Sequence, residues 1–137
     1  MAGDNKSFGE YLKALRNEKK EFDESFSVRG LAEKIGLSAT YLSKIERGEL
    51  PASNETIYLL AKALGVSPDS LFARAGKLEP ELQKKITSNE SPVEMAAFLR
   101  TASGLSQDRL EMYKRMIDAA EGNAPAESSG GNDAKKV

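Results

Sequence analysis

The chain has no cysteine, no histidine and no tryptophan among its 137 residues. Without cysteine there is no disulfide, no thiolate nucleophile and no thiolate ligand for a metal ion. Without histidine, the usual general base, proton shuttle and zinc ligand are missing. Most hydrolase and metalloenzyme mechanisms are therefore excluded, which leaves only carboxylate pairs or lysine chemistry for an enzyme. We expect no enzymatic activity, no metal and no cofactor.

Long apolar runs and a large excess of one charge are also missing. No apolar run is long enough to span a bilayer, and residues 1–7 lack the apolar core of a signal peptide. The sequence therefore predicts a cytoplasmic protein without a membrane partner. The net charge is −1, so a nucleic-acid-binding protein of this composition must gather its positive charge on one face.

Apolar residues recur at helical spacing along most of the chain, and no segment shows the alternation of a strand. The first predicted helix covers residues 7–20, with Ser7 as its cap and Glu10 at the capping-box position. Residues 21–26 are predicted to be a loop. Four more helices are each preceded by a polar cap, and three of them are ended by glycine. These caps are Ser27, Ser38, Asn54 and Ser67, and the glycines are Gly36, Gly48 and Gly65.

A boundary is predicted at Gly76. Three shorter helical patterns follow over residues 79–87, 91–102 and 106–121, and the second opens with Ser91 as a cap followed by a first-turn proline. Residues 122–137 are rich in Gly, Ser, Ala and Asn, which predicts a disordered tail. The prediction is an all-α protein with one domain over residues 7–76, a helical segment over residues 77–121 and the tail.

Residues 27–48 predict two helices joined by a tight turn at Gly36. Ala32 is small where the helices must approach each other, and larger apolar side chains form the predicted wedge between them. The wedge consists of Leu31, Ile35, Leu37, Leu42 and Ile45. The first turns of the second helix, around residues 38–43, then project outward with small polar side chains. A helix presented in this way fits the major groove of B-DNA.

These motifs resemble the helix-turn-helix of the Xre/Cro/phage-repressor family. The resemblance rests on residues 31–38 (LAEKIGLS), 41–49 (YLSKIERGE) and 55–67 (ETIYLLAKALGVS), and on Leu12 to Arg16, all in the family's order. It covers residues 7–76, about half of the chain. It implies a five-helix fold like that of lambda repressor. It also implies a DNA-binding transcriptional regulator, most simply a repressor that occludes a promoter.

The resemblance also implies which residues would contact DNA. Side chains at the start and middle of the recognition helix would face base edges, with Lys44 reaching either guanine or a phosphate. These residues are Ala39, Thr40, Ser43 and Lys44. Other polar groups would hold the phosphate backbone. These are Arg29, Ser38, Arg47, Ser53, and the amide groups at Asn54–Thr56. Arg16 and Glu46 match a structural ion pair of the family.

Two features depart from the family pattern. Val28 stands where the family often carries glutamine, and Gly30 stands where it often carries glutamate. The loop between the first two helices is also longer than usual, and it contains Phe22 and Phe26. These differences bear on how the domain approaches DNA and not on the fold.

The three C-terminal helices are too short to build a comfortable core of their own. We expect them to support a homodimer, because two copies about 34 Å apart would read a palindrome. The apolar residues expected at that interface are Leu82, Ile86, Phe98, Leu99, Leu110, Tyr113 and Ile117.

Three other interpretations remain open. The layout also resembles repressors whose C-terminal segment is cut by a separate zinc metallopeptidase, which implies a cut site near residues 101–106 and a protease partner. The chain could instead be a DNA-binding antitoxin whose C-terminal helices bind a toxin, or a protein-interaction module that binds no DNA.

Overall fold

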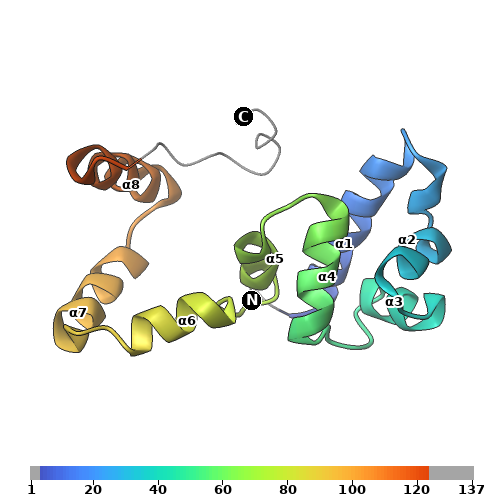
Figure 1. Ribbon diagram of the computed structural model, residues 1–137, viewed down its shortest axis with the longest axis horizontal. Coiled ribbons are helices and arrows are strands. Elements are labelled where there is room, and N and C mark those ends of the chain that lie inside the picture. The colour runs from blue at the N-terminus through green and yellow to red at the C-terminus, as the bar shows by residue number, and fades with distance from the viewer. Residues whose placement is uncertain (1–3, 124–137) are drawn as a thin grey trace. The chain divides into compact units, whose positions relative to one another are not determined.

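The computed structural model describes residues 4–123, and all the secondary structure in this range is helical (Figure 1). The prediction of an all-α protein is confirmed. The chain divides into two compact units between Glu79 and Pro80. The predicted tail lies outside the described residues, apart from its first two positions.

The helices of the first unit follow the predicted order. They are α1 (Asn5–Lys20), the short 3-10 turn η1 (Glu24–Phe26), α2 (Val28–Ile35), α3 (Ala39–Glu46), α4 (Asn54–Leu64) and α5 (Pro68–Arg74). The second unit contains α6 (Pro80–Thr87), α7 (Pro92–Ser103) and α8 (Gln107–Glu121). The stretch suggested as a protease site spans the end of α7 and the short connection to α8.

Serine side chains cap most of the helices. Three predicted caps, at Ser27, Ser38 and Ser67, each accept a hydrogen bond from the amide three residues later, and Ser106 does the same at the start of α8. The predicted start of α4 is wrong by one residue, because Ser53 caps it and Asn54 is already helical.

The predicted start of α1 is also wrong, and α7 lacks one predicted cap bond. The carboxylate of Asp4 caps α1 by accepting the amide of Ser7 at 2.6 Å, so Ser7 lies inside the helix and the predicted capping box with Glu10 does not form. Helix α7 starts as predicted, with Ser91 at its N-cap position and Pro92 in its first turn. The Ser91 side chain makes no cap bond, however, and the Ser91 amide donates to the side chain of Asn89 at 2.6 Å.

The connection between α1 and α2 is more ordered than the predicted loop. Asp23 accepts hydrogen bonds from the amide and the hydroxyl of Ser25, which begins the turn η1. This turn packs directly on α2, where a Cβ atom at Gly30 would lie 2.0 Å from the carbonyl oxygen of Ser25. The glycine that departs from the family pattern is therefore the residue that the close packing of η1 requires.

The core of the first unit is formed by apolar residues from α1 to α5. Its buried members are Phe8, Leu12, Leu31, Ala32, Ile35, Leu42, Ile45, Ala52, Ile57, Leu60, Ala61, Leu64, Leu71 and Phe72. At Gly9, a Cβ atom would lie 2.5 Å from the carbonyl oxygens of Ile45 and Glu46, so the backbones of α1 and α3 are in close contact. The core therefore holds α3 against two other helices, which fixes its orientation within the unit.

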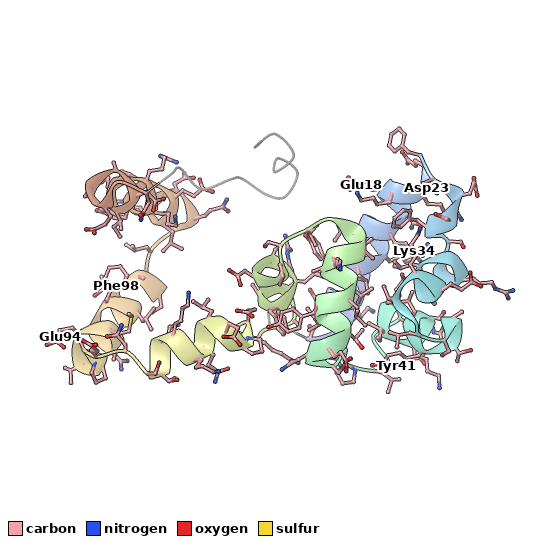
Figure 2. All side chains as sticks on the ribbon, viewed as in Figure 1. Glu18, Asp23, Lys34, Tyr41, Glu94 and Phe98 are labelled. Carbon is pink, nitrogen blue, oxygen red and sulfur yellow. The ribbon has the colours of Figure 1, made fainter. Side chains whose placement is uncertain are left out.

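The second unit has a different kind of interior. None of its described apolar side chains is buried, and its buried residue is Asp118, which accepts hydrogen bonds from Lys114 at 2.6 Å and from Asn123 at 3.4 Å. Most of the large apolar residues of α7 and α8 are exposed, including Phe98, which is 57% exposed (Figure 2). No helix among residues 4–123 is long and apolar enough to cross a membrane.

Candidate nucleic-acid interface

The turn between α2 and α3 is built by a glycine in the left-handed conformation. Gly36 has φ +75°, and the amide of Leu37 donates to the carbonyl of Ala32 at 2.9 Å. Leu37 is half-buried against the core, while the other members of the predicted wedge are buried. The wedge between the two helices is therefore present as predicted.

Helix α3 has one buried side and one outward side. Leu42, Ile45 and Glu46 are buried. Tyr41, which Figure 2 labels, is half-buried and packs against the core. The five residues of α3 predicted to contact DNA are more exposed than these core residues, but not all to the same extent. Thr40, Lys44 and the C-cap residue Arg47 are exposed, whereas Ala39 and Ser43 are half-buried. The outward side therefore offers a methyl group, two hydroxyls and two cations to a partner.

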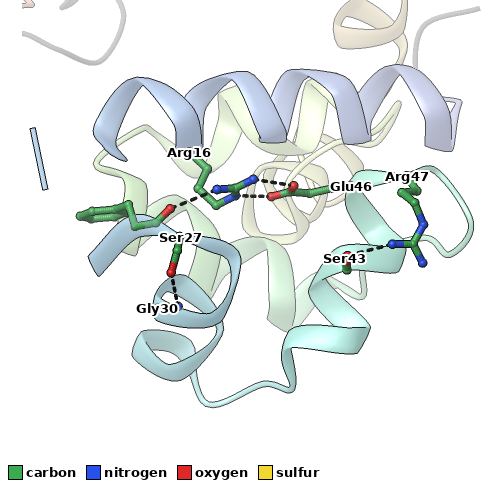
Figure 3. Close-up of polar contacts among 7 residues, drawn as sticks. Arg16, Ser27, Gly30, Ser43, Glu46 and Arg47 are labelled. Carbon is green, nitrogen blue, oxygen red and sulfur yellow. Dashed lines mark hydrogen bonds and ion pairs between the residues drawn. The ribbon is translucent and has the colours of Figure 1, made fainter. Parts of the chain in front are cut away.

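The last turn of α3 carries a hydrogen-bonded network, of which Figure 3 shows the bond between Arg47 and Ser43. The guanidinium of Arg47 donates through Nη1 to the hydroxyl of Ser43 at 2.8 Å, through Nε to Glu49 Oε2 at 2.8 Å, and through Nη2 to Glu49 Oε1 at 3.4 Å. The side-chain hydrogen bonds between Arg47 and Glu49 raise the pKa of Arg47 and lower the pKa of Glu49. The sequence analysis missed Glu49, whose role depends on where the end of α3 places it.

The start of α4 differs from the prediction. The hydroxyl of Ser53 accepts the amide of Thr56 at 3.1 Å and donates to Thr56 Oγ1 at 3.0 Å, and Thr56 is only 4% exposed. The amide of Thr56 is thus occupied by the cap, so Thr56 supports the helix start and does not offer a free donor to a phosphate.

Asn54 is exposed, and its Oδ1 accepts a hydrogen bond from Lys77 at 2.8 Å. Lys77 follows the α4–α5 pair, and no pattern in the sequence could have placed this cation beside a residue 23 positions earlier. It adds a positive charge to the start of α4, next to two predicted phosphate contacts, Ser53 and Asn54.

The two remaining residues predicted to contact DNA lie on α2 and at the start of α3, and Val28, which differs from the family pattern, is close to them in sequence. Arg29 is exposed in the first turn of α2, and Ser38 is exposed while its hydroxyl caps α3 at 3.0 Å from the amide of Tyr41. Val28 packs against the core, so its apolar side chain contributes to the fold at a position where the family often has a polar one.

Comparison with known proteins identifies the domain. The sequence profile of the helix-turn-helix family matches residues 12–71, which include α2, the turn and α3. Residues 12–71 are thus similar to a helix-turn-helix domain of the Xre/Cro type.

Curated relatives share this helix-turn-helix domain. An uncharacterized HTH-type transcriptional regulator of Mycobacterium tuberculosis is 50% identical over 54 residues, which cover 39% of this chain and 39% of that protein. The HTH-type transcriptional repressor RghR of Bacillus subtilis is 40% identical over 74 residues, which cover 53% of this chain and 51% of that protein. The chain thus spans about half or less of the length of these curated relatives.

A solved structure also resembles the chain. A chain of the SinR protein/SinI protein complex is 25% identical with a TM-score of 0.44, and the match covers 85% of this chain and 99% of that chain.

Proposed function

We propose that the helix-turn-helix domain binds double-stranded DNA sequence-specifically and that the protein regulates transcription, most simply as a repressor. The observation that carries this proposal is the division of α3 into a side fixed in the core and an outward side of small polar and basic residues. The names of the similar proteins, a transcriptional regulator and a transcriptional repressor, agree with it. Such a protein acts where the chromosome lies, so cytoplasmic localisation belongs to the same proposal.

In this proposal α3 enters the major groove. Ala39 and Thr40 would contact thymine methyl groups, and Lys44 would reach guanine O6 and N7 or a nearby phosphate. Polar groups around the helix would position the backbone: Arg29, Ser38, Ser53, Asn54 and Lys77. Arg47 was also expected to contact a phosphate, but Glu49 occupies its Nε and Nη2 groups, so it is left out of this set. Because the net charge is −1, these local cations have to supply the attraction for DNA.

We further propose that the second unit makes the protein a homodimer that reads an inverted repeat. Its helices leave several large apolar side chains of α7 and α8 exposed, and these line a groove of about 630 Å³ that includes Phe98, Leu110 and Ile117. A unit without buried apolar side chains among its described residues needs a second apolar surface for stability. Two copies would supply that surface to each other and would place two recognition helices on one DNA site.

The decisive experiment is selection of bound duplexes from a random-sequence library, followed by sequencing. The proposal expects enrichment of one motif, arranged as an inverted repeat. Lys44→Ala is expected to weaken binding to the selected duplex more than binding to a random duplex. Lys62→Ala, at an exposed position in the last turn of α4, is the matched control and should change neither.

Two results would count against parts of the proposal. An equal loss on both duplexes for Lys44→Ala would make Lys44 a phosphate contact. No enriched motif for the wild-type protein, with only a salt-sensitive background, would overturn sequence-specific binding and favour a protein-interaction function.

A further inference from the structure

The end of α3 fixes the backbone of Glu49. Gly48 has φ +79°, its amide donates to the carbonyl of Ile45 at 3.0 Å, and the amide of Glu49 donates to the carbonyl of Lys44 at 2.9 Å. This pair of hydrogen bonds is the Schellman motif, in which the residue after the glycine folds back along the last helical turn. The position of Glu49 beside the outward side of α3 is therefore set by the backbone.

The same end of α3 is also held by α1. A Cβ atom at Gly48 would lie 2.7 Å from the Cα atom of Lys6, so the two backbones are in close contact there. The segment that carries Glu49 thus has little freedom to move away from α3.

Glu49 occupies the edge of Arg47 that would otherwise bind a phosphate. The Nε and Nη2 groups of an arginine form the fork that binds carboxylates and phosphates through two parallel hydrogen bonds. In Arg47 both groups donate to Glu49. Three of the five N–H bonds of Arg47 are engaged within the protein, and the carboxylate cancels its charge.

Arg47 in turn orients Ser43. The Ser43 hydroxyl accepts from Arg47 Nη1, so one of its lone pairs is occupied while its own hydrogen remains free to donate. In the major groove such a donor matches an acceptor on a base, such as guanine N7 or O6, adenine N7 or thymine O4. The network therefore gives Ser43 a defined hydrogen-bonding polarity.

We propose that Glu49 is a specificity-determining residue, which restrains Arg47 from attracting the phosphates of any DNA sequence and holds it where it makes Ser43 a donor to a base. The proposal rests on DNA binding as the function of this face. Non-specific binding depends on phosphate neutralisation, whereas base contacts provide the specificity. Glu49 therefore acts on the ratio between the two kinds of binding, as a positioning residue that works through Arg47.

The test compares the wild-type protein, Glu49→Gln, Arg47→Ala and the double variant on the selected duplex and on a random duplex, over a series of salt concentrations. Glu49→Gln is expected to raise the affinity for the random duplex roughly threefold to tenfold. The salt dependence on that duplex should steepen by about one unit of slope, because Arg47 then neutralises a phosphate. The affinity for the selected duplex should rise less, so the specificity ratio falls.

The double variant shows whether Glu49 acts through Arg47. In the Arg47→Ala background, Glu49→Gln is expected to have little effect, whereas a through-space effect of the charge would persist. Glu18→Gln is the matched control, since Glu18 is an exposed carboxylate of α1, away from the residues assigned to DNA, that makes no hydrogen bond or ion pair within residues 4–123. A duplex selection with Glu49→Gln should relax the preference at the same base position as a selection with Ser43→Ala.

Clear outcomes would overturn the inference. Equal gains for Glu49→Gln and Glu18→Gln, or an undiminished effect in the Arg47→Ala background, would reduce the role of Glu49 to net charge. If Glu49→Gln left the ratio of specific to non-specific affinity unchanged, Glu49 would likewise not determine specificity. These failures differ from failure of the proposed function, in which the wild-type protein itself would bind the library without enriching any motif.

Discussion

Arg16 and Glu46 form a buried ion pair with two hydrogen bonds, from Nε to Oε2 at 2.6 Å and from Nη2 to Oε1 at 3.0 Å (Figure 3). Both side chains are only 5% exposed. Arg16 Nη1 also donates to the carbonyl of Phe26 at 3.2 Å. One guanidinium thus joins α1, the last turn of α3 and the turn η1. The family resemblance implied the pair between Arg16 and Glu46, whereas the bond to η1 comes from the structure.

Removal of one partner of this ion pair should destabilise the domain strongly. We expect Glu46→Ala to lower the free energy of unfolding by about 3–5 kcal/mol, because it leaves the Arg16 cation buried without its partner. Arg16→Met combined with Glu46→Leu should cost less than Glu46→Ala, since no charge is then left uncompensated. Urea unfolding measures both. Arg47→Met, which breaks an exposed pair, should leave the unfolding midpoint unchanged, and a large loss there would contradict this distinction.

Substitution of Gly30 should disrupt the packing of η1 on α2. The new Cβ atom of Gly30→Ala would lie 2.0 Å from a backbone carbonyl oxygen, so the two backbones must separate. We expect a loss of about 1–3 kcal/mol in the free energy of unfolding, measured by thermal denaturation. Gly104→Ala is the control, because its Cβ would find its nearest neighbour at 3.7 Å. Equal melting temperatures for the two variants would show that η1 is not tightly packed.

The helix caps give a prediction that separates the observed α4 start from the one expected from sequence. Ser53→Ala and Ser38→Ala should each lower the free energy of unfolding by about 1 kcal/mol, because each removes the acceptor of an orphan amide. Asn54→Ala should have a smaller effect, since Asn54 is the first helical residue and its side chain accepts a hydrogen bond from the exposed Lys77 instead of capping the helix. A larger loss for Asn54→Ala than for Ser53→Ala in urea unfolding would contradict the cap assignment.

The proposed homodimer makes a prediction about association. Phe98→Glu and Ile117→Lys place charges in the apolar groove of the second unit and should convert a dimer into a monomer in sedimentation equilibrium at micromolar concentration. Phe22→Glu is the control, because Phe22 is 89% exposed in the first unit and should leave the mass unchanged. A monomeric wild-type protein under these conditions would refute the dimer.

Most of the first unit followed from its sequence because local signals and the core pattern agree there. Each serine cap at Ser27, Ser38 and Ser67 precedes an apolar face with helical spacing, so one register satisfies both. The Arg16–Glu46 pair lies 30 residues apart in sequence and was available only through the family resemblance.

The errors occurred at helix starts where two neighbouring residues can both act as the cap. They also occurred where contacts with distant parts of the chain determine where a helix begins or where a side chain lies. Ser53 and Asn54 are both good caps, and their order along the chain does not separate them. Helix α1 begins at Asn5, earlier than predicted, and its additional residues include Lys6, whose backbone lies against Gly48. Within the candidate interface, Glu49 and Lys77 were missed because the chain folds back to place each of them.

The two sides of α3 have a consequence for how such a protein can diverge. The residues that hold the helix in place, such as Leu42 and Ile45, are fully buried, whereas Thr40 and Lys44 are exposed. Exposed helix positions can be exchanged at little cost in stability, while buried ones cannot. The outward side chains can therefore be rewritten while the scaffold is inherited unchanged, so that one architecture can serve many different target sites.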